Sequence, residues 1–139
     1  MDQTIIFFFA AIIIVGGLLF AVIEFTKKGT KQLDVNRYRI KWLAIEQQLK
    51  KDEPSSYHLV VLNADKLLDQ ALKDRGAKGE TLGERLKSSA TLFSNRNTVW
   101  TAHKLRNQIA HETDVSVNYD AARQALNGFK QALKDVGAI

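Results

Sequence analysis

The sequence of 139 residues contains no cysteine and only one proline, Pro54. The absence of cysteine fits a protein kept in a reducing compartment. With only three histidines and no H-E-x-x-H motif, the sequence also argues against a zinc site, so we expect neither a metal nor a cofactor. No stretch alternates between apolar and polar residues as a strand does, and no segment is repeated or of low complexity. These absences favour an all-helical protein.

Signatures of common enzyme classes are missing as well. The glycine-rich segment that contains Gly76, Gly79 and Gly83 lacks the order G-x(4)-G-K-[ST] of a phosphate-binding loop, so we interpret it as a plain connection. No serine, histidine and aspartate occur in the pattern of a hydrolase.

The longest uncharged run begins at Ile5 and ends at Ile23. A helix of this length crosses the core of a bilayer, which is about 30 Å thick. A cleaved signal peptide would start with basic residues and have a shorter apolar core, whereas only Asp2 and the terminal amine precede this run. A core helix in so small a protein would not be apolar on every face. The run therefore predicts a retained single-pass transmembrane anchor over residues 1–26.

Basic residues follow this anchor and none precedes it. Lys27, Lys28 and Lys31 come directly after the span, which predicts that the C-terminal part lies on the cytoplasmic side of the cell membrane. The whole chain has a net charge of +5, and all 20 lysines and arginines lie after the span. Two interpretations of this basic excess remain open, attraction to anionic membrane lipid and affinity for nucleic acid.

Behind the anchor we expect a basic juxtamembrane segment over residues 27–33 and a helical domain over residues 34–139. Apolar periodicity predicts five helices with short connections, which is typical of an antiparallel four- to five-helix bundle. We place the second helix start at Ser55 or Ser56, the third at the capping box of Thr81 and Glu84, and the fourth at Asn97. The expected helices cover residues 31–53, 55–76, 81–93, 97–111 and 119–136.

The first expected helix has apolar residues on two sides. One stripe contains Tyr38, Trp42, Ile45 and Leu49, and the other contains Leu33, Ile40, Leu43 and Ala44. One stripe can face the core of the domain. The other needs a partner, which can be the membrane surface, a neighbouring helix or a second subunit.

The fourth expected helix places Arg106 inside an apolar arc, where a charge is costly unless it is paired. His103, Asn107 and His111 recur every four residues and form a polar ridge along the edge of this arc. Two interpretations follow. Arg106 either serves as part of an anion-binding site or pairs structurally with one of three carboxylates, those of Asp65, Asp69 and Glu84.

The segment from Arg106 to His111, with the sequence RNQIAH, resembles the R-N-x-x-x-H form of the R-x(4–6)-H signature of HEPN domains. The resemblance extends over the domain from about residue 34 to the end. It implies a small helical bundle, usually a dimer, of the kind found in RNases of toxin–antitoxin and defence systems and in their non-catalytic relatives.

The same resemblance implies roles for individual residues. In the family, arginine and histidine side chains of both subunits meet in a cleft at the dimer interface and cleave RNA without a metal, through attack of the ribose 2′-hydroxyl. Arg106 would then bind the scissile phosphate, His111 would move a proton, and Asn107 would orient one of these groups. His103 and the three carboxylates would support them or pair with them.

We therefore expect a membrane-tethered, HEPN-like interaction module, present as a homodimer, that binds RNA, a nucleotide or a separate protein partner. One alternative is a metal-independent endoribonuclease that uses Arg106 and His111. The other is a purely structural membrane protein. The anchor favours the interaction module, because such an anchor is unusual for a toxin RNase.

Overall fold

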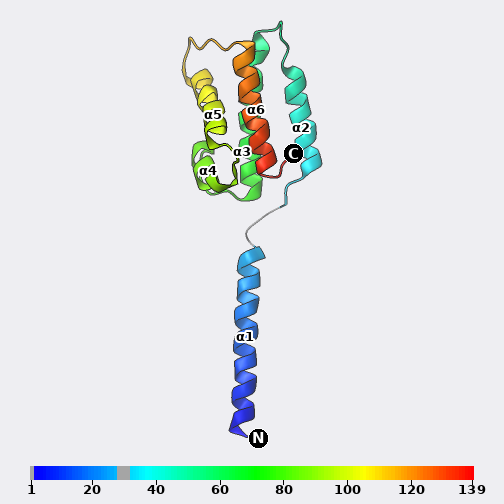
Figure 1. Cartoon of the computed structure of the whole chain (residues 1–139), viewed down its shortest axis with the longest axis vertical. Coiled ribbons are helices and arrows are strands. Elements are labelled where there is room, and N and C mark those ends of the chain that lie inside the picture. The colour runs from blue at the N-terminus through cyan, green and yellow to red at the C-terminus, as the bar shows by residue number, and fades with distance from the viewer. Residues whose placement is uncertain (1, 28–31) are drawn as a thin grey trace. The chain divides into compact units, whose positions relative to one another are not determined.

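The structure, a computed structural model, describes residues 2–27 and 32–139, and within these ranges it contains helices and no strand (Figure 1). The predicted all-helical fold is thus confirmed. Lys28 and Lys31 lie outside the described residues. The chain divides into two compact units, Met1–Lys31 and Gln32–Ile139, and each is considered by itself. The elements are α1 (Gln3–Lys27), α2 (Val35–Gln48), α3 (Ser55–Arg75), α4 (Leu82–Ser88), a 3-10 turn (Ala90–Leu92), α5 (Arg96–His111) and α6 (Tyr119–Asp135).

The first unit is the helix α1. Its segment Gln3–Thr26 is long and apolar enough to cross a membrane, and none of it is buried within the unit. Large apolar side chains are exposed on all sides of this helix, from Ile5 to Phe25. A helix of 25 residues extends over about 37 Å, which exceeds the apolar thickness of a bilayer of about 30 Å.

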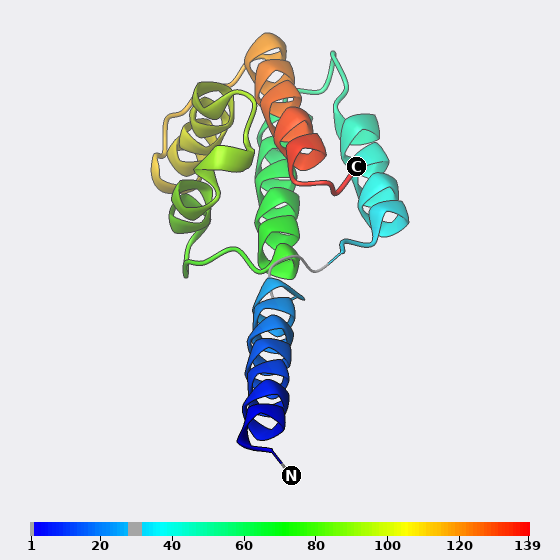
Figure 2. The same cartoon turned by 60° about the horizontal axis from the view of Figure 1, so that its bottom comes forward.

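The second unit is a bundle with α3 at its centre. This helix packs against α2, α4, α5 and α6, and α6 also packs along α5 (Figures 1 and 2). The core consists mainly of side chains from α3 and α6, among which Leu68, Leu72, Phe129 and Leu133 are fully buried. The bundle therefore places α2 and α5 on different sides of α3.

The helix α2 is shorter than predicted. The helix begins after Asp34, which caps it, because the Asp34 side chain accepts a hydrogen bond from the Arg37 backbone N–H. On the other side, the Ser56 hydroxyl accepts from the Lys50 N–H at 3.2 Å and donates to the Glu53 carbonyl at 2.7 Å. The expected end at residue 53 was wrong. The helix ends at Gln48, because Ser56 in the first turn of α3 binds the backbone of Lys50 and Glu53.

The predicted start of α3 at Ser55 is confirmed, although neither serine caps the helix, and the predicted start of α5 was wrong by one residue. Pro54 precedes α3 without a side-chain cap, so Ser55 and Ser56 are the first residues of the helix rather than its caps. The cap of α5 is Asn95, which accepts from the Thr98 N–H, and not Asn97. The predicted end of α3 is confirmed at Gly76, whose φ of +89° suits a residue without a side chain.

The capping box at the start of α4 forms only in part. Thr81 accepts from the Glu84 N–H at 3.2 Å, as the pattern requires. The Glu84 carboxylate, however, accepts from the N–H of Glu80 at 2.6 Å rather than from Thr81. The expected helix over residues 81–93 is a shorter helix, which ends at Ser88, followed by the 3-10 turn.

The two stripes of α2 have different surroundings. Tyr38, Trp42 and Ile45 are buried in the core of the bundle, whereas Ile40 and Leu43 are 69% and 54% exposed. Leu33 departs from the expected second stripe, because it packs against the core.

Candidate functional site

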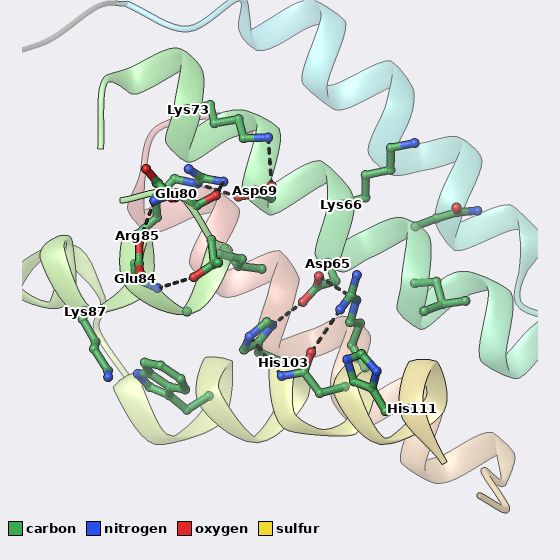
Figure 3. A pocket seen from close by; sticks show the side chains of 18 residues that line it. Asp65, Lys66, Asp69, Lys73, Glu80, Glu84, Arg85, Lys87, His103 and His111 are labelled. Carbon is green, nitrogen blue, oxygen red and sulfur yellow. Dashed lines mark hydrogen bonds and ion pairs between the residues drawn. The ribbon is translucent and has the colours of Figure 1, made fainter. Parts of the chain in front are cut away.

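A cleft of about 910 Å³ opens where α3, α4 and α5 meet (Figure 3). Most of the site residues considered above line it, together with residues that sequence reasoning had not singled out. Two polar clusters lie in this cleft. One is centred on Asp65 of α3 and the other on Asp69, one helical turn further along.

The first cluster is built around a buried carboxylate. Asp65 is only 4% exposed. Its Oδ1 lies 2.7 Å from Nδ1 of His103, which is also buried, and its Oδ2 lies 3.3 Å from Nε of Arg106. Of the three carboxylates proposed as partners of Arg106, Asp65 is the one that pairs with it among the described residues.

Asn107 closes this cluster into a ring. Its Oδ1 accepts a hydrogen bond from Nη1 of Arg106 at 3.0 Å, and its Nδ2 lies 3.3 Å from Nε2 of His103. When the His103 proton is on Nδ1, Asp65 accepts it and Nε2 accepts from the Asn107 amide, so each of the four contacts joins a donor to an acceptor. We call Asp65, His103, Asn107 and Arg106 the Asp65 ring.

The ring orients the guanidinium of Arg106 without covering it. Asp65 and Asn107 hold Nε and Nη1, while 36% of the Arg106 side chain stays exposed. An arginine whose torsions are already fixed loses less conformational freedom when it binds a carboxylate or a phosphate. The arrangement suits an anion that enters from the cleft.

The second cluster is structural in character. Nε of Arg85 lies 2.7 Å from Asp69 Oδ1, and its two Nη atoms donate to the backbone carbonyls of Gly79 and Glu80. Lys73 lies 3.2 Å from the other Asp69 oxygen. Arg85 thereby fastens the loop before α4 to the centre of the bundle. Asp69 therefore belongs to this cluster rather than to Arg106.

The environment of Asp69 changes its acidity. Burial of the carboxyl raises its pKa, but the hydrogen bonds and charges of Arg85 and Lys73 outweigh burial and hold the pKa below its ordinary value. The carboxylate is therefore the form that the fold stabilises.

His111 occupies a different position from the ring. It is an exposed residue in the last turn of α5 and lines the same cleft as Arg106. The exposed lysines Lys66 and Lys87 line it too. Glu84 lines the opposite end of the cleft, where its carboxylate is bound to the Glu80 backbone.

Sequence reasoning missed several residues of the cleft, and two of them pack against the clusters described above. Arg85 is buried between Leu82 and Leu86 on the inner face of α4, and that position in the apolar pattern was the available signal. Trp100 is half-buried, and its ring meets His103 edge-on at a centroid distance of 5.9 Å. Its place one turn before His103 could have identified it as a neighbour.

Comparisons of the chain with known protein families, with curated proteins and with solved structures gave no match. The resemblance to HEPN domains thus stays a prediction from the segment RNQIAH and its place on a late helix.

Proposed function

We propose that this protein is a membrane-tethered, HEPN-like interaction module that binds an anionic group of RNA, a nucleotide or a protein partner in the cleft between α3, α4 and α5. The observation that carries the proposal is the guanidinium of Arg106, which the Asp65 ring fixes in position while 36% of the side chain remains exposed. The exposed Lys66 and Lys87 add positive charge around the same cleft.

The location belongs to the same proposal. We infer that α1 is retained as a single-pass anchor in the cell membrane, and that the lysines behind it keep the bundle on the cytoplasmic side. A homodimer is part of the proposal because HEPN domains usually pair, with their clefts joined at the interface. The bundle would then meet its ligand at the membrane face.

A metal-independent endoribonuclease is the second candidate, and it is favoured by the presence of His111 and Arg106 in one cleft. The ring supplies another histidine for this chemistry. His103 is oriented by a buried carboxylate, as general bases commonly are. In this reaction Arg106 would hold the phosphate, and a histidine would take the proton of the 2′-hydroxyl.

Binding of a short, fluorescently labelled single-stranded RNA to the full chain in nanodiscs tests the proposal. Replacing Arg106 by Gln should weaken binding about tenfold or more, because a hydrogen bond to a charged group contributes roughly 1.5–3 kcal/mol. Arg96→Gln is the matched control, since Arg96 is an exposed arginine at the start of the same helix. Equal losses in both variants would mean that only overall charge matters.

The same samples separate the remaining alternatives. Cleavage of the RNA in the presence of EDTA that His111→Ala or His103→Ala abolishes would establish the nuclease. Binding of labelled ATP with the same dependence on Arg106, but no binding of RNA, would identify a nucleotide ligand. Failure to bind either probe would leave the protein partner or the purely structural protein.

A further inference from the structure

The outer side of α2 exposes large apolar side chains to solvent, next to the polar residues Asn36 and Gln47. Ile40 and Leu43 are 69% and 54% exposed, and Ala44 beside them is exposed as well. The opposite side of the same helix holds Tyr38 and Trp42 in the core. We call the surface formed by Ile40, Leu43 and Ala44 the outer α2 face.

Basic side chains flank this face. Arg37, Arg39 and Lys41 are all exposed and lie on both sides of Ile40 around the helix. The acidic residue of α2, Glu46, is occupied elsewhere, because its carboxylate accepts from Trp42 and from Lys130 of α6.

Two carboxylates lie near the basic flank, and both are engaged. Asp34 caps the helix, and Asp74 of α3 accepts from the Tyr38 hydroxyl and from Gln70. The positive charge of the flank is offset in part by Asp74 and stays in excess. An exposed apolar stripe between basic residues is the pattern of helices that lie on anionic membrane surfaces.

The connection between α1 and α2 is short. The helix α1 ends at Lys27 and α2 begins at Val35, so seven residues, which can extend over at most about 25 Å, join the proposed anchor to α2. α2 is the first described element after the span. A short tether of this kind makes docking intramolecular and greatly raises the effective concentration of the surface.

A second copy of this chain is a poor occupant of the outer α2 face. Pairing the same face of two copies would bring Arg37, Arg39 and Lys41 of one copy next to those of the other, and like charges at an interface are repulsive. Anionic headgroups supply the opposite charge. The charges therefore select lipid over self-association at this face.

We propose that the outer α2 face docks on the anionic surface of the leaflet from which α1 emerges. Ile40 and Leu43 enter the boundary between headgroups and acyl chains, and Arg37, Arg39 and Lys41 contact the headgroups. The inference rests on the proposed role of α1 as an anchor and is independent of the ligand of the cleft.

The absence of cysteine makes a direct test practicable, because one introduced cysteine is the sole site for a spin label. Leu43→Cys is labelled in the full chain, in nanodiscs of phosphatidylcholine with phosphatidylglycerol, and its collision rates with oxygen and with a water-soluble nickel chelate are measured. We expect high access to oxygen and low access to nickel. The matched control is Asn127→Cys, an exposed position on α6, which should behave as a site in water.

A charge-deficient variant tests the electrostatic part. Replacing Arg37, Arg39 and Lys41 together by Gln should lower the ratio of docked to undocked protein about 100-fold, given the usual contribution of each basic residue near an anionic surface. In nanodiscs of phosphatidylcholine alone, the Leu43 label of the parent protein should likewise become more accessible to nickel and less accessible to oxygen. Unchanged docking in both experiments would overturn the role of the basic flank.

The remaining outcomes separate the two proposals. A Leu43 label as accessible to nickel as the Asn127 label would overturn docking. A Leu43 label shielded from both reagents would show a protein partner on this face and would also overturn it. A label at Ile13 tests the anchor by itself, because a water-exposed Ile13 would reject the anchor whatever the Leu43 label reports.

Discussion

Asp65 is the residue on which the candidate site depends most, because one buried carboxylate serves both a histidine and an arginine. Its removal would leave two polar side chains without their acceptor. Mutation data on buried polar groups indicate a cost of about 1–3 kcal/mol for each group left unsatisfied.

We therefore expect Asp65→Ala to lower the free energy of unfolding by about 2–3 kcal/mol. The loss stays modest because water can solvate the partly exposed Arg106 once its partner is gone. Urea unfolding of the full chain in detergent micelles measures it through tryptophan fluorescence. Both tryptophans, Trp42 and Trp100, lie in the bundle, so their fluorescence reports unfolding of the bundle and not of α1. Asp52→Ala, at an exposed turn, is the control and should change stability by less than about 0.5 kcal/mol. Equal effects of the two substitutions would contradict the role of Asp65.

Asp69 leads to a prediction about pH. The pKa of the Asp69 carboxyl is lower in the folded protein than in the unfolded chain, where an aspartate has a pKa of about 3.9. A lowered folded pKa contributes stability at pH values above the unfolded pKa, and this contribution disappears as the pH falls through the folded pKa. The free energy of unfolding should therefore decrease as the pH drops below about 5.

Asp69→Asn should lower stability at neutral pH and reduce that acid-side slope. Part of the slope should remain, because the pKa values of Glu46, Asp74 and Asp135 are lowered as well. Unfolding curves at several pH values between 3 and 7 provide the measurement. The same slope in the variant as in the parent would remove Asp69 from this explanation.

At the scale of helices, the contact between α5 and α6 depends on one small residue. A Cβ atom at Gly128 would lie 3.0 Å from the Thr98 carbonyl oxygen, which is tighter than ordinary contact. Gly128→Val should thus push the two helices apart and cost about 1–3 kcal/mol. Gly83→Ala in α4 is the control, because its nearest neighbour would be 3.8 Å away.

For that control we expect unchanged stability or a gain of up to about 1 kcal/mol from the better helix propensity of alanine. Tryptophan fluorescence again serves as the measurement. If Gly128→Val were as stable as Gly83→Ala, the helices would have room to adjust and the close approach would carry no energetic weight.

The elements that sequence reasoning located well are those whose limits are set by neighbouring residues. The end of α3 at Gly76 is an example, because a left-handed residue stops the helix locally. The end of α2 was missed because Leu49, Lys50 and Lys51 are good helix formers, and the nearest residue that breaks a helix is Pro54. The hydrogen bonds of Ser56 and Tyr57 to the backbone of residues 50–53 decide that end, and they depend on how the chain turns back.

The site was predictable to a similar extent. Helical spacing placed Arg106 beside His103 and Asn107 and named Asp65 among its partners. Periodicity along one helix cannot show whether Asp65 or Asp69 is the partner of Arg106, because the two residues are one turn apart. The partner depends on the position along α3 at which α5 packs. Arg85 could have been noticed from its place in the apolar pattern of α4, but its partner Asp69 could not, because that residue belongs to another helix.

For the whole molecule, orientation in the membrane is the property to test first. A reporter enzyme that works only in the cytoplasm should be active when it is fused after Ile139, because the basic residues that follow the span are expected to keep the C-terminus in the cytoplasm. Moving lysines from positions 27, 28 and 31 to the N-terminal side of the span should invert the result. An inactive reporter in the unmodified fusion would contradict both the location and any role with cytoplasmic RNA.

The Asp65 ring also has a consequence for how a ligand would reach the histidine. Nη1 of Arg106 carries two hydrogens and donates one of them to Asn107 Oδ1, so an anion can bind the remaining hydrogens of the guanidinium without disturbing the ring. Nε2 of His103, in contrast, lies 3.3 Å from the Asn107 amide, so a substrate could reach this nitrogen only after that amide has moved away. Anion binding and access to the histidine would therefore be separate events, and Asn107 would control only the second.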